Sequence, residues 1–212
     1  MFCFIRCFKI LKIAVLGSTK GTDLQAIIDA IDTGKLIDVE ISIVISNKEE
    51  AYILQRAEQY DIPALFISGK DRTREEFDTE VMRILDEKGI GLVLLIGYMR
   101  FISKGFVDKW SNKIMNVHPS LLPKYAGGMD KGVHETILAA GEKETGCTIH
   151  FVDEGADTGP IIIQKKCDIE FGETIDTLKE KVQKLEGIAF IEVIELFRDG
   201  KIKVIDNKVI IE

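Results

Sequence analysis

An asparagine and a histidine lie two residues apart in the stretch MNVHPSLLPKY, residues 115–125. The two prolines that follow them exclude the middle of a strand or a helix, so residues 114–117 are predicted to form a strand that ends there. Asn116 and His118 then project from the same face at the strand's carboxyl end. A neutral histidine beside an asparagine in a cleft can move a proton and hold a developing oxyanion.

The stretch FVDEGADTGP carries three carboxylates, those of Asp153, Glu154 and Asp157. Their spacing does not match a calcium-binding loop, and a solvated acidic loop is the simpler alternative. An aspartate that reached His118 would favour its charged form and fix its orientation. On its own, His118 would more often be structural, and His150 is predicted to orient a neighbouring loop.

The turn GSTKGTDLQ, residues 17–25, is a candidate anion site. A glycine-rich turn at a helix start offers free backbone N–H groups and the positive end of the helix dipole. The turn matches neither the P-loop nor the dinucleotide fingerprint, so ATP and dinucleotide binding lose support. A plain strand-to-helix turn is an equal alternative, and Thr22 or Asp23 is predicted to cap the helix.

The composition narrows the class of partner. The chain has 212 residues, 46% of them hydrophobic, and its 28 basic and 35 acidic residues give a net charge of −7. That balance argues against nucleic acid or an anionic membrane as the main partner. No C-x-x-C pair or zinc-finger spacing occurs, so we expect no metal site and a reduced cytoplasmic protein. The cysteines concerned are Cys3, Cys7, Cys147 and Cys167.

Strand-like and helix-like segments alternate along the chain, which predicts a doubly wound, mostly parallel α/β sheet. Such sheets bind ligands at the carboxyl ends of their strands, so the turn at 17–23, the loop after Ile96 and the exit at 116–123 should share one crevice. The predicted strands are 12–16, 39–46, 63–67, 90–97, 113–118, 145–152 and 159–169; the predicted helices are 22–34, 50–61, 73–89 and 174–200; a hairpin around 206–207 closes the chain.

The domain division follows from the same pattern. Residues 12–212 are expected to form a single domain, because no linker or low-complexity tract interrupts them. Residues 1–11 are apolar but interrupted by positive charges. They are expected to be an N-terminal extension, either packed on the domain or arising from an upstream start codon.

Two segments carry a resemblance. NVHPSLLPKY, followed by TIHFVDEGADTGPIIIQ, resembles the glycinamide ribonucleotide formyltransferases of purine biosynthesis, which are folate-dependent. The similarity runs from about Lys12 to the C-terminal helix. It implies a Rossmann-like formyltransferase fold with a long C-terminal helix. It also implies formyl transfer from 10-formyltetrahydrofolate, as cosubstrate, to the amine of glycinamide ribonucleotide without a metal, by a monomer or homodimer.

The resemblance also implies a role for each candidate residue. Asn116 and His118 would stabilise the oxyanion and move protons, and Asp157 would support His118 and help to position a water. The substrate phosphate would lie on Gly21, Thr22 and Asp23. The other implied contacts are Gln183 and Glu186 for glycinamide ribonucleotide, and Arg74, Met99, Arg100, Phe101, Ile102, Asn116, Asp153, Glu154, Gly155, Ala156 and Asp157 for the folate.

A departure from the family pattern in the phosphate turn and three alternative functions stay open. The family usually has Gly-Ser-Asn in the phosphate turn, where this chain has Gly-Thr-Asp ending at Asp23. An aspartate beside a phosphate is unfavourable unless it caps the helix and points away, or unless Lys20 or Lys131 offsets its charge. The alternatives are a formyltransferase for another amine, such as a nucleotide sugar, and a 10-formyltetrahydrofolate hydrolase. A folate- or nucleotide-binding protein without activity is a further, non-enzymatic alternative.

Overall fold

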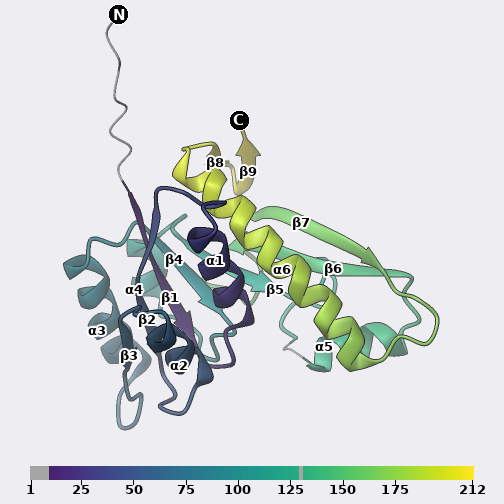
Figure 1. The fold of residues 1–212 in the computed structure, drawn as a ribbon, viewed down its shortest axis with the longest axis horizontal. Helices are drawn as coiled ribbons and strands as arrows, with labels where there is room; N and C mark the ends of the chain where they lie inside the picture. The colour runs from purple at the N-terminus through teal and green to yellow at the C-terminus, as the bar shows by residue number, and fades with distance from the viewer. Residues whose placement is uncertain (1–9, 129–130) are drawn as a thin grey trace, which may run out of the picture.

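The computed structural model describes residues 10–128 and 131–212 (Figure 1). Its main sheet contains β1 Leu11–Gly17, β2 Val39–Ser46, β3 Ala64–Phe66, β4 Leu92–Ile96, β5 Ile114–His118, β6 Glu144–Phe151 and β7 Ile161–Asp168. The helices are α1 Thr22–Asp32, α2 Tyr52–Gln59, α3 Arg74–Glu87, α4 Lys104–Lys109, α5 Lys131–Ala139 and α6 Ile175–Arg198. A hairpin of β8 Ile202–Ile205 and β9 Lys208–Ile211 follows α6.

The main sheet has the strand order β3-β2-β1-β4-β5-β6-β7. The first five strands in this order pair in parallel, and β6 and β7 are antiparallel to their neighbours. The predicted doubly wound, mostly parallel fold is therefore confirmed. Because β1, β4 and β5 are adjacent and parallel, the segments that follow them leave the sheet at the same edge.

Helices cover both faces of the sheet, and each face has its own core (Figure 1). Helices α1, α2, α5 and α6 pack on one face, where Leu24, Phe190 and Ile194 are fully buried. Helices α3 and α4 pack on the other face through Phe77 and Phe106. Strands covered on both sides need continuous apolar runs, which explains why β1 and β4 are so uniformly hydrophobic.

The longer helices begin where the sequence supplies caps. Thr73 accepts a hydrogen bond from the backbone N–H of Glu76, and the Glu76 side chain accepts one from Thr73, which forms a capping box at α3. Thr174 and Thr177 make the equivalent pair at α6. The closing hairpin also matches its prediction, since both turn residues have positive φ values.

The predicted side-chain cap of α1 by Thr22 or Asp23 is wrong. The cap position is Gly21, which adopts the left-handed conformation (φ 67°, ψ 44°), and no side chain forms a capping hydrogen bond. A Cβ at this position would lie 2.4 Å from Ile53 on α2. The close approach of α2 and the positive φ therefore both favour glycine, and the turn places its backbone directly at the helix start.

Helix α4 was not predicted because it has only six residues and contains a glycine. Ser103 caps it, and Phe106 and Trp110 pack into the second core, so tertiary packing determines the helix. At the N-terminus, residues 1–9 of the expected extension lie outside the described residues, whereas Leu11 pairs with Val39 within the sheet. Within the described ranges, no helix combines the length and apolar character needed to cross a membrane.

Candidate active site

Asp157 lies between two histidines and an asparagine. Its Oδ2 is 3.1 Å from Nδ1 of His118 and accepts a 2.8 Å hydrogen bond from the backbone N–H of Gly127. Its Oδ1 is 3.4 Å from Nδ2 of Asn116 and 3.5 Å from Nε2 of His150. The structure therefore brings the three predicted catalytic residues together and adds His150 to them.

Strand pairing explains how these residues meet. Asn116 is the cross-strand partner of His150 in the antiparallel pair of β5 and β6, and His118 lies two residues further along β5. Asp157 comes from the connection between β6 and β7, where it has a φ of 57°. Aspartate tolerates this left-handed conformation better than most residues, and the tight loop returns its carboxylate to the end of β5.

The surroundings of Asp157 keep its carboxylate ionised. Burial alone would raise its pKa, but the hydrogen bonds from His118 and the Gly127 amide outweigh burial and hold the pKa of Asp157 well below its usual range. Asp157 is therefore negatively charged at any pH near neutrality.

Both ring nitrogens of His118 face hydrogen-bond acceptors. Nδ1 faces the carboxylate of Asp157, and Nε2 lies 2.9 Å from the backbone carbonyl oxygen of Tyr125. Only the protonated imidazole has an N–H on both nitrogens, so this arrangement suits an imidazolium. The ring is 2% exposed. His118 is thus a buried, oriented donor whose Nε2–H could be redirected to another acceptor if Tyr125 moved.

His150 fixes the amide of Asn116. The Nδ1 atom of His150 lies 2.8 Å from the carbonyl oxygen of Phe151, so this nitrogen carries the proton of a neutral ring. Nε2 then accepts from Nδ2 of Asn116 at 3.1 Å, and the second amide hydrogen faces Asp157. The sequence suggested only that His150 orients a loop. The alternation of side chains along β6 was the only signal in the sequence for the position of His150. Its contact with Asn116 depends on the register between β5 and β6.

The turn before α1 is supported from α2. The backbone N–H of Ile53 bonds to the carbonyl of Thr19, and Nε of Arg56 bonds to the carbonyl of Lys20 at 3.2 Å. Ser18 joins the turn to the loop after β4, because its hydroxyl accepts from the N–H of Met99. The predicted proximity of these two segments is therefore present in the structure.

The residues expected to contact glycinamide ribonucleotide lie on α1 and α6. Glu186 is buried and Gln183 is half-buried on α6, and Asp23 is buried at the start of α1. Burial raises the pKa of the Cys147 thiol on β6, and the charges of Glu186 and Asp23 raise it further. These three side chains therefore lie in one neighbourhood between α1, α6 and the sheet.

The residues expected to contact the folate lie around the loop after β4. Burial raises the pKa of Asp78, while the charges of Arg100 and Arg74 lower it, so both arginines lie near this buried carboxyl. The guanidinium of Arg100 also stacks on the ring of Phe77 at 4.2 Å. Phe101 is 71% exposed beside them. Met99 is exposed as well, and Ile102 is half-buried against the second core.

The loop with Asp153 and Glu154 is joined to the same region. Glu154 forms an ion pair with Lys104 at the start of α4. Asp153 stabilises the loop itself, since its carboxylate accepts from the N–H of Gly155 at 3.0 Å and from the hydroxyl of Thr158 at 2.7 Å. Residues Gly155 and Ala156 are exposed at the loop's tip. In the described part of the chain, no group of three or more His, Cys, Asp or Glu side chains could hold a metal ion.

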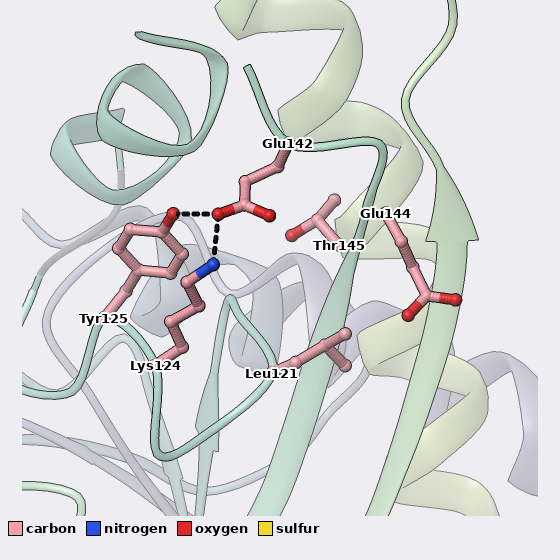
Figure 2. Close-up of a pocket in the computed structure, with 6 residues that line it drawn as sticks. All are labelled: Leu121, Lys124, Tyr125, Glu142, Glu144 and Thr145. Atoms are coloured by element: carbon pink, nitrogen blue, oxygen red, sulfur yellow. Dashed lines mark hydrogen bonds and ion pairs between the residues drawn. The ribbon is translucent and has the colours of Figure 1, made fainter. Parts of the chain in front are cut away.

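A separate pocket of about 220 Å³ lies beside the segment that contacts His118. Figure 2 shows the hydroxyl of Tyr125 and the ammonium of Lys124 converging on the carboxylate of Glu142. Tyr125 therefore connects the pocket with the candidate active site. Its hydroxyl lies 2.7 Å from Glu142, and its backbone carbonyl contacts His118. The pocket is lined by Leu121, Lys124, Tyr125, Glu142, Glu144 and Thr145.

Comparison with known proteins decides the family. The formyl transferase family model matches residues 11–194. The chain belongs to the formyl transferase family. A phosphoribosylglycinamide formyltransferase of Haemophilus influenzae is 39% identical over 197 residues, which cover 92% of this chain and 91% of that protein. The resemblance stated from the sequence is thus confirmed.

Two further similarities agree with this membership of the formyl transferase family. The solved structure of the phosphoribosylglycinamide formyltransferase of Coxiella burnetii matches with a TM-score of 0.89 and 42% identity, covering 95% of this chain and 93% of that one. The trifunctional purine biosynthetic protein adenosine-3 of Drosophila melanogaster is 44% identical over 191 residues, 89% of this chain. This chain spans only 14% of the length of that larger protein.

Proposed function

We propose that this chain transfers the formyl group of 10-formyltetrahydrofolate to the amine of glycinamide ribonucleotide. The observation that carries the proposal is the buried His118, held by the Asp157 carboxylate at the carboxyl end of β5. A relative named for this activity covers nearly the same length of chain. The partners proposed are small molecules, the location proposed is the cytoplasm, and a monomer or homodimer is expected.

The reaction needs a proton donor and an oxyanion donor, and His118 can serve as both. The amine lone pair attacks the formyl carbon, and the carbonyl electrons move to oxygen to give a tetrahedral intermediate. In our proposal Nε2–H of His118 donates to that oxygen, in place of its present bond to the carbonyl of Tyr125. When the bond from carbon to folate N10 breaks, N10 gains a proton and the amine nitrogen loses one.

Asn116 is proposed to assist the same oxygen. Its Nδ2 has a good contact to His150 at 3.1 Å and a weaker one to Asp157 at 3.4 Å. The weaker bond is the one that a developing oxyanion could replace. Asp157 is proposed to hold His118 in the orientation that directs Nε2–H to this oxygen. One well-placed oxyanion donor is worth about 2.7–4 kcal/mol.

The proposed binding roles divide between the residues at α1 and α6 and the residues around the loop after β4. The turn at Gly21, Thr22 and Asp23 is proposed to bind the substrate phosphate through free backbone N–H groups at the start of α1. Gln183 and Glu186 are proposed to face the rest of glycinamide ribonucleotide. The folate is proposed to lie against Arg74, Met99, Arg100, Phe101, Ile102, Asn116 and the loop from Asp153 to Asp157.

The proposal is tested by offering the chain three acceptors. Turnover of 10-formyltetrahydrofolate is followed by absorbance with glycinamide ribonucleotide, with an amino-sugar nucleotide, or with water alone. Turnover that requires glycinamide ribonucleotide supports the proposal. Equal turnover without an amine would identify a hydrolase, and turnover only with the sugar nucleotide would identify a different formyltransferase. Binding of both ligands without turnover would indicate a non-enzymatic protein.

Glu142 is expected to act on turnover through Tyr125. Glu142→Gln weakens the contacts that anchor the segment carrying the Tyr125 carbonyl, and the expected result is a kcat lowered by roughly two- to fivefold. Glu144→Gln is the matched control, because Glu144 lines the same pocket but pairs with Lys166 on β7. Steady-state kinetics at saturating substrates check this prediction. Equal kcat values for the two variants would contradict it.

A further inference from the structure

Asp23 is a buried carboxyl at the turn proposed to hold the phosphate. It is the second residue of α1 and is 4% exposed. Its Oδ1 has no hydrogen-bond partner among the described residues. A buried polar atom without a partner is costly, so a native structure that retains one invites an explanation through a ligand.

The position of Asp23 directs its side chain toward the turn. In an α-helix the Cα–Cβ bonds tilt toward the N-terminus, so a side chain at the second position lies over the turn before the helix. That turn ends at Gly21, where the first backbone N–H groups of α1 have no side-chain cap. The carboxyl and these donors therefore face the same small region.

Of the expected ways of offsetting a negative Asp23, capping of the helix is absent from the described structure. Asp23 does not cap the helix, because Gly21 occupies the cap position without any side-chain bond. Lys20 is exposed, and the side chain of Lys131 lies outside the described residues. Arg56 contacts the turn, but its guanidinium binds the carbonyl of Lys20 and the side chain of Gln25.

Among the described residues, the groups that the other packed elements bring toward Asp23 are acidic, uncharged or distant. Glu186 faces this neighbourhood from α6 and Cys147 from β6, and the hydroxyl of Tyr60, after α2, contacts Gln25. Strand β2 contributes Glu40, which is exposed at the strand's amino end, the opposite edge of the sheet. Burial raises the pKa of Asp23 to about 7, so its neutral form is well populated near neutral pH.

We propose that Asp23 binds the substrate phosphate as a neutral carboxylic acid, donating its O–H to a phosphate oxygen. This inference rests on the proposed function, which places a phosphate at this turn. An ionised Asp23 would repel the phosphate, whereas the neutral acid adds a donor to the N–H groups of α1. Asp23 thereby makes the affinity for the phosphorylated substrate depend on pH.

The test compares the wild-type chain with Asp23→Asn. Asparagine has nearly the same shape and donates through its NH₂ group, but it does not titrate. For one site with a pKa of about 7, the ratio of wild-type to variant kcat/KM for glycinamide ribonucleotide should fall by about tenfold between pH 6 and pH 8. The phosphate's own second ionisation, near pH 6, affects both chains and cancels in the ratio.

Calorimetry supplies a second readout that a purely structural role would not change. Substrate binding at pH 8, measured in two buffers of different ionisation enthalpy, should take up about one more proton in the wild type than in Asp23→Asn. A flat kcat/KM ratio together with equal proton uptake would overturn the inference. Proton uptake by the wild type can be measured even if the variant does not fold. Absence of formyl transfer by the wild type at every pH would instead count against the proposed function.

Discussion

Replacing His118 by alanine is expected to lower kcat for formyl transfer by about 10²–10³-fold, with much smaller changes in the KM of either substrate. The ring is held by Asp157 on one side and presents Nε2 on the other, so it is the best-oriented donor at the end of β5. Its removal deletes the proposed oxyanion contact but leaves the phosphate turn and the proposed folate contacts unchanged. Single-turnover and steady-state kinetics measure the effect.

Two controls separate this role from a structural one. The circular dichroism spectrum of His118→Ala should match that of the wild type, because the strand and its neighbours keep their backbone pairing. Added imidazole should restore part of kcat, since the lost group leaves space for it. A variant that folds and turns over at a near-normal rate would show that His118 is a buried structural histidine.

Asp157→Asn is expected to lower kcat by about 10²-fold or more, although the side chain keeps its shape. The amide removes the negative charge and can present an NH₂ group to the N–H of His118 or Gly127, where acceptors are needed. Asp153→Asn is the matched control in the same loop, because the carboxylate of Asp153 bonds only to Gly155 and Thr158 among the described residues. Comparable losses of kcat in both variants would indicate a loop-wide distortion instead.

Asp157 should also contribute to stability in a pH-dependent way. Its pKa is lower in the folded chain than the ordinary value of 3.8, so folding stabilises the ionised form. The contribution is fully present above about pH 5 and is lost as the pH falls below 3.8 toward the folded-state value. Urea unfolding of the wild type and Asp157→Asn should differ more at pH 7 than at pH 3. An equal difference at both values would argue against the stabilising contacts to His118 and Gly127.

The sequence was most informative where local chemistry and periodicity act together. The continuous apolar runs at β1 and β4, the long helix-like stretches at α3 and α6, and the turn residues of the final hairpin all indicated elements that the structure contains. Adjacency of the parallel strands followed from the alternation of strands and helices. The common edge for the turn after β1 and the exit from β5 was predictable for the same reason.

Long-range pairing limited what the sequence could predict about the site. His150 meets Asn116 only because β6 runs antiparallel to β5 in one particular register, which no local pattern specifies. The contact between Tyr125 and His118 depends on a turn that is anchored by Glu142, which lies just before β6. The resemblance indicated Asp157 as a catalytic residue. Only the folded chain shows which groups contact each of its two carboxylate oxygens.

The start of α1 shows how packing can override a local preference. Thr22 and Asp23 are good capping residues by type, yet α2 approaches so closely that Gly21 takes the cap position. Asp23 is therefore the second residue of the helix instead of its cap, and its side chain is buried. The feature that carries the further inference therefore comes from the contact between two helices.

The most direct test of formyl transfer is the fate of the formyl carbon itself. 10-Formyltetrahydrofolate labelled with carbon-13 in the formyl group is mixed with the wild-type chain and glycinamide ribonucleotide, and the products are followed by carbon NMR. We expect the label to move to the amide of formylglycinamide ribonucleotide, and to do so far more slowly with His118→Ala. Label that appears as formate at the same rate with and without the amine would contradict the proposed transfer.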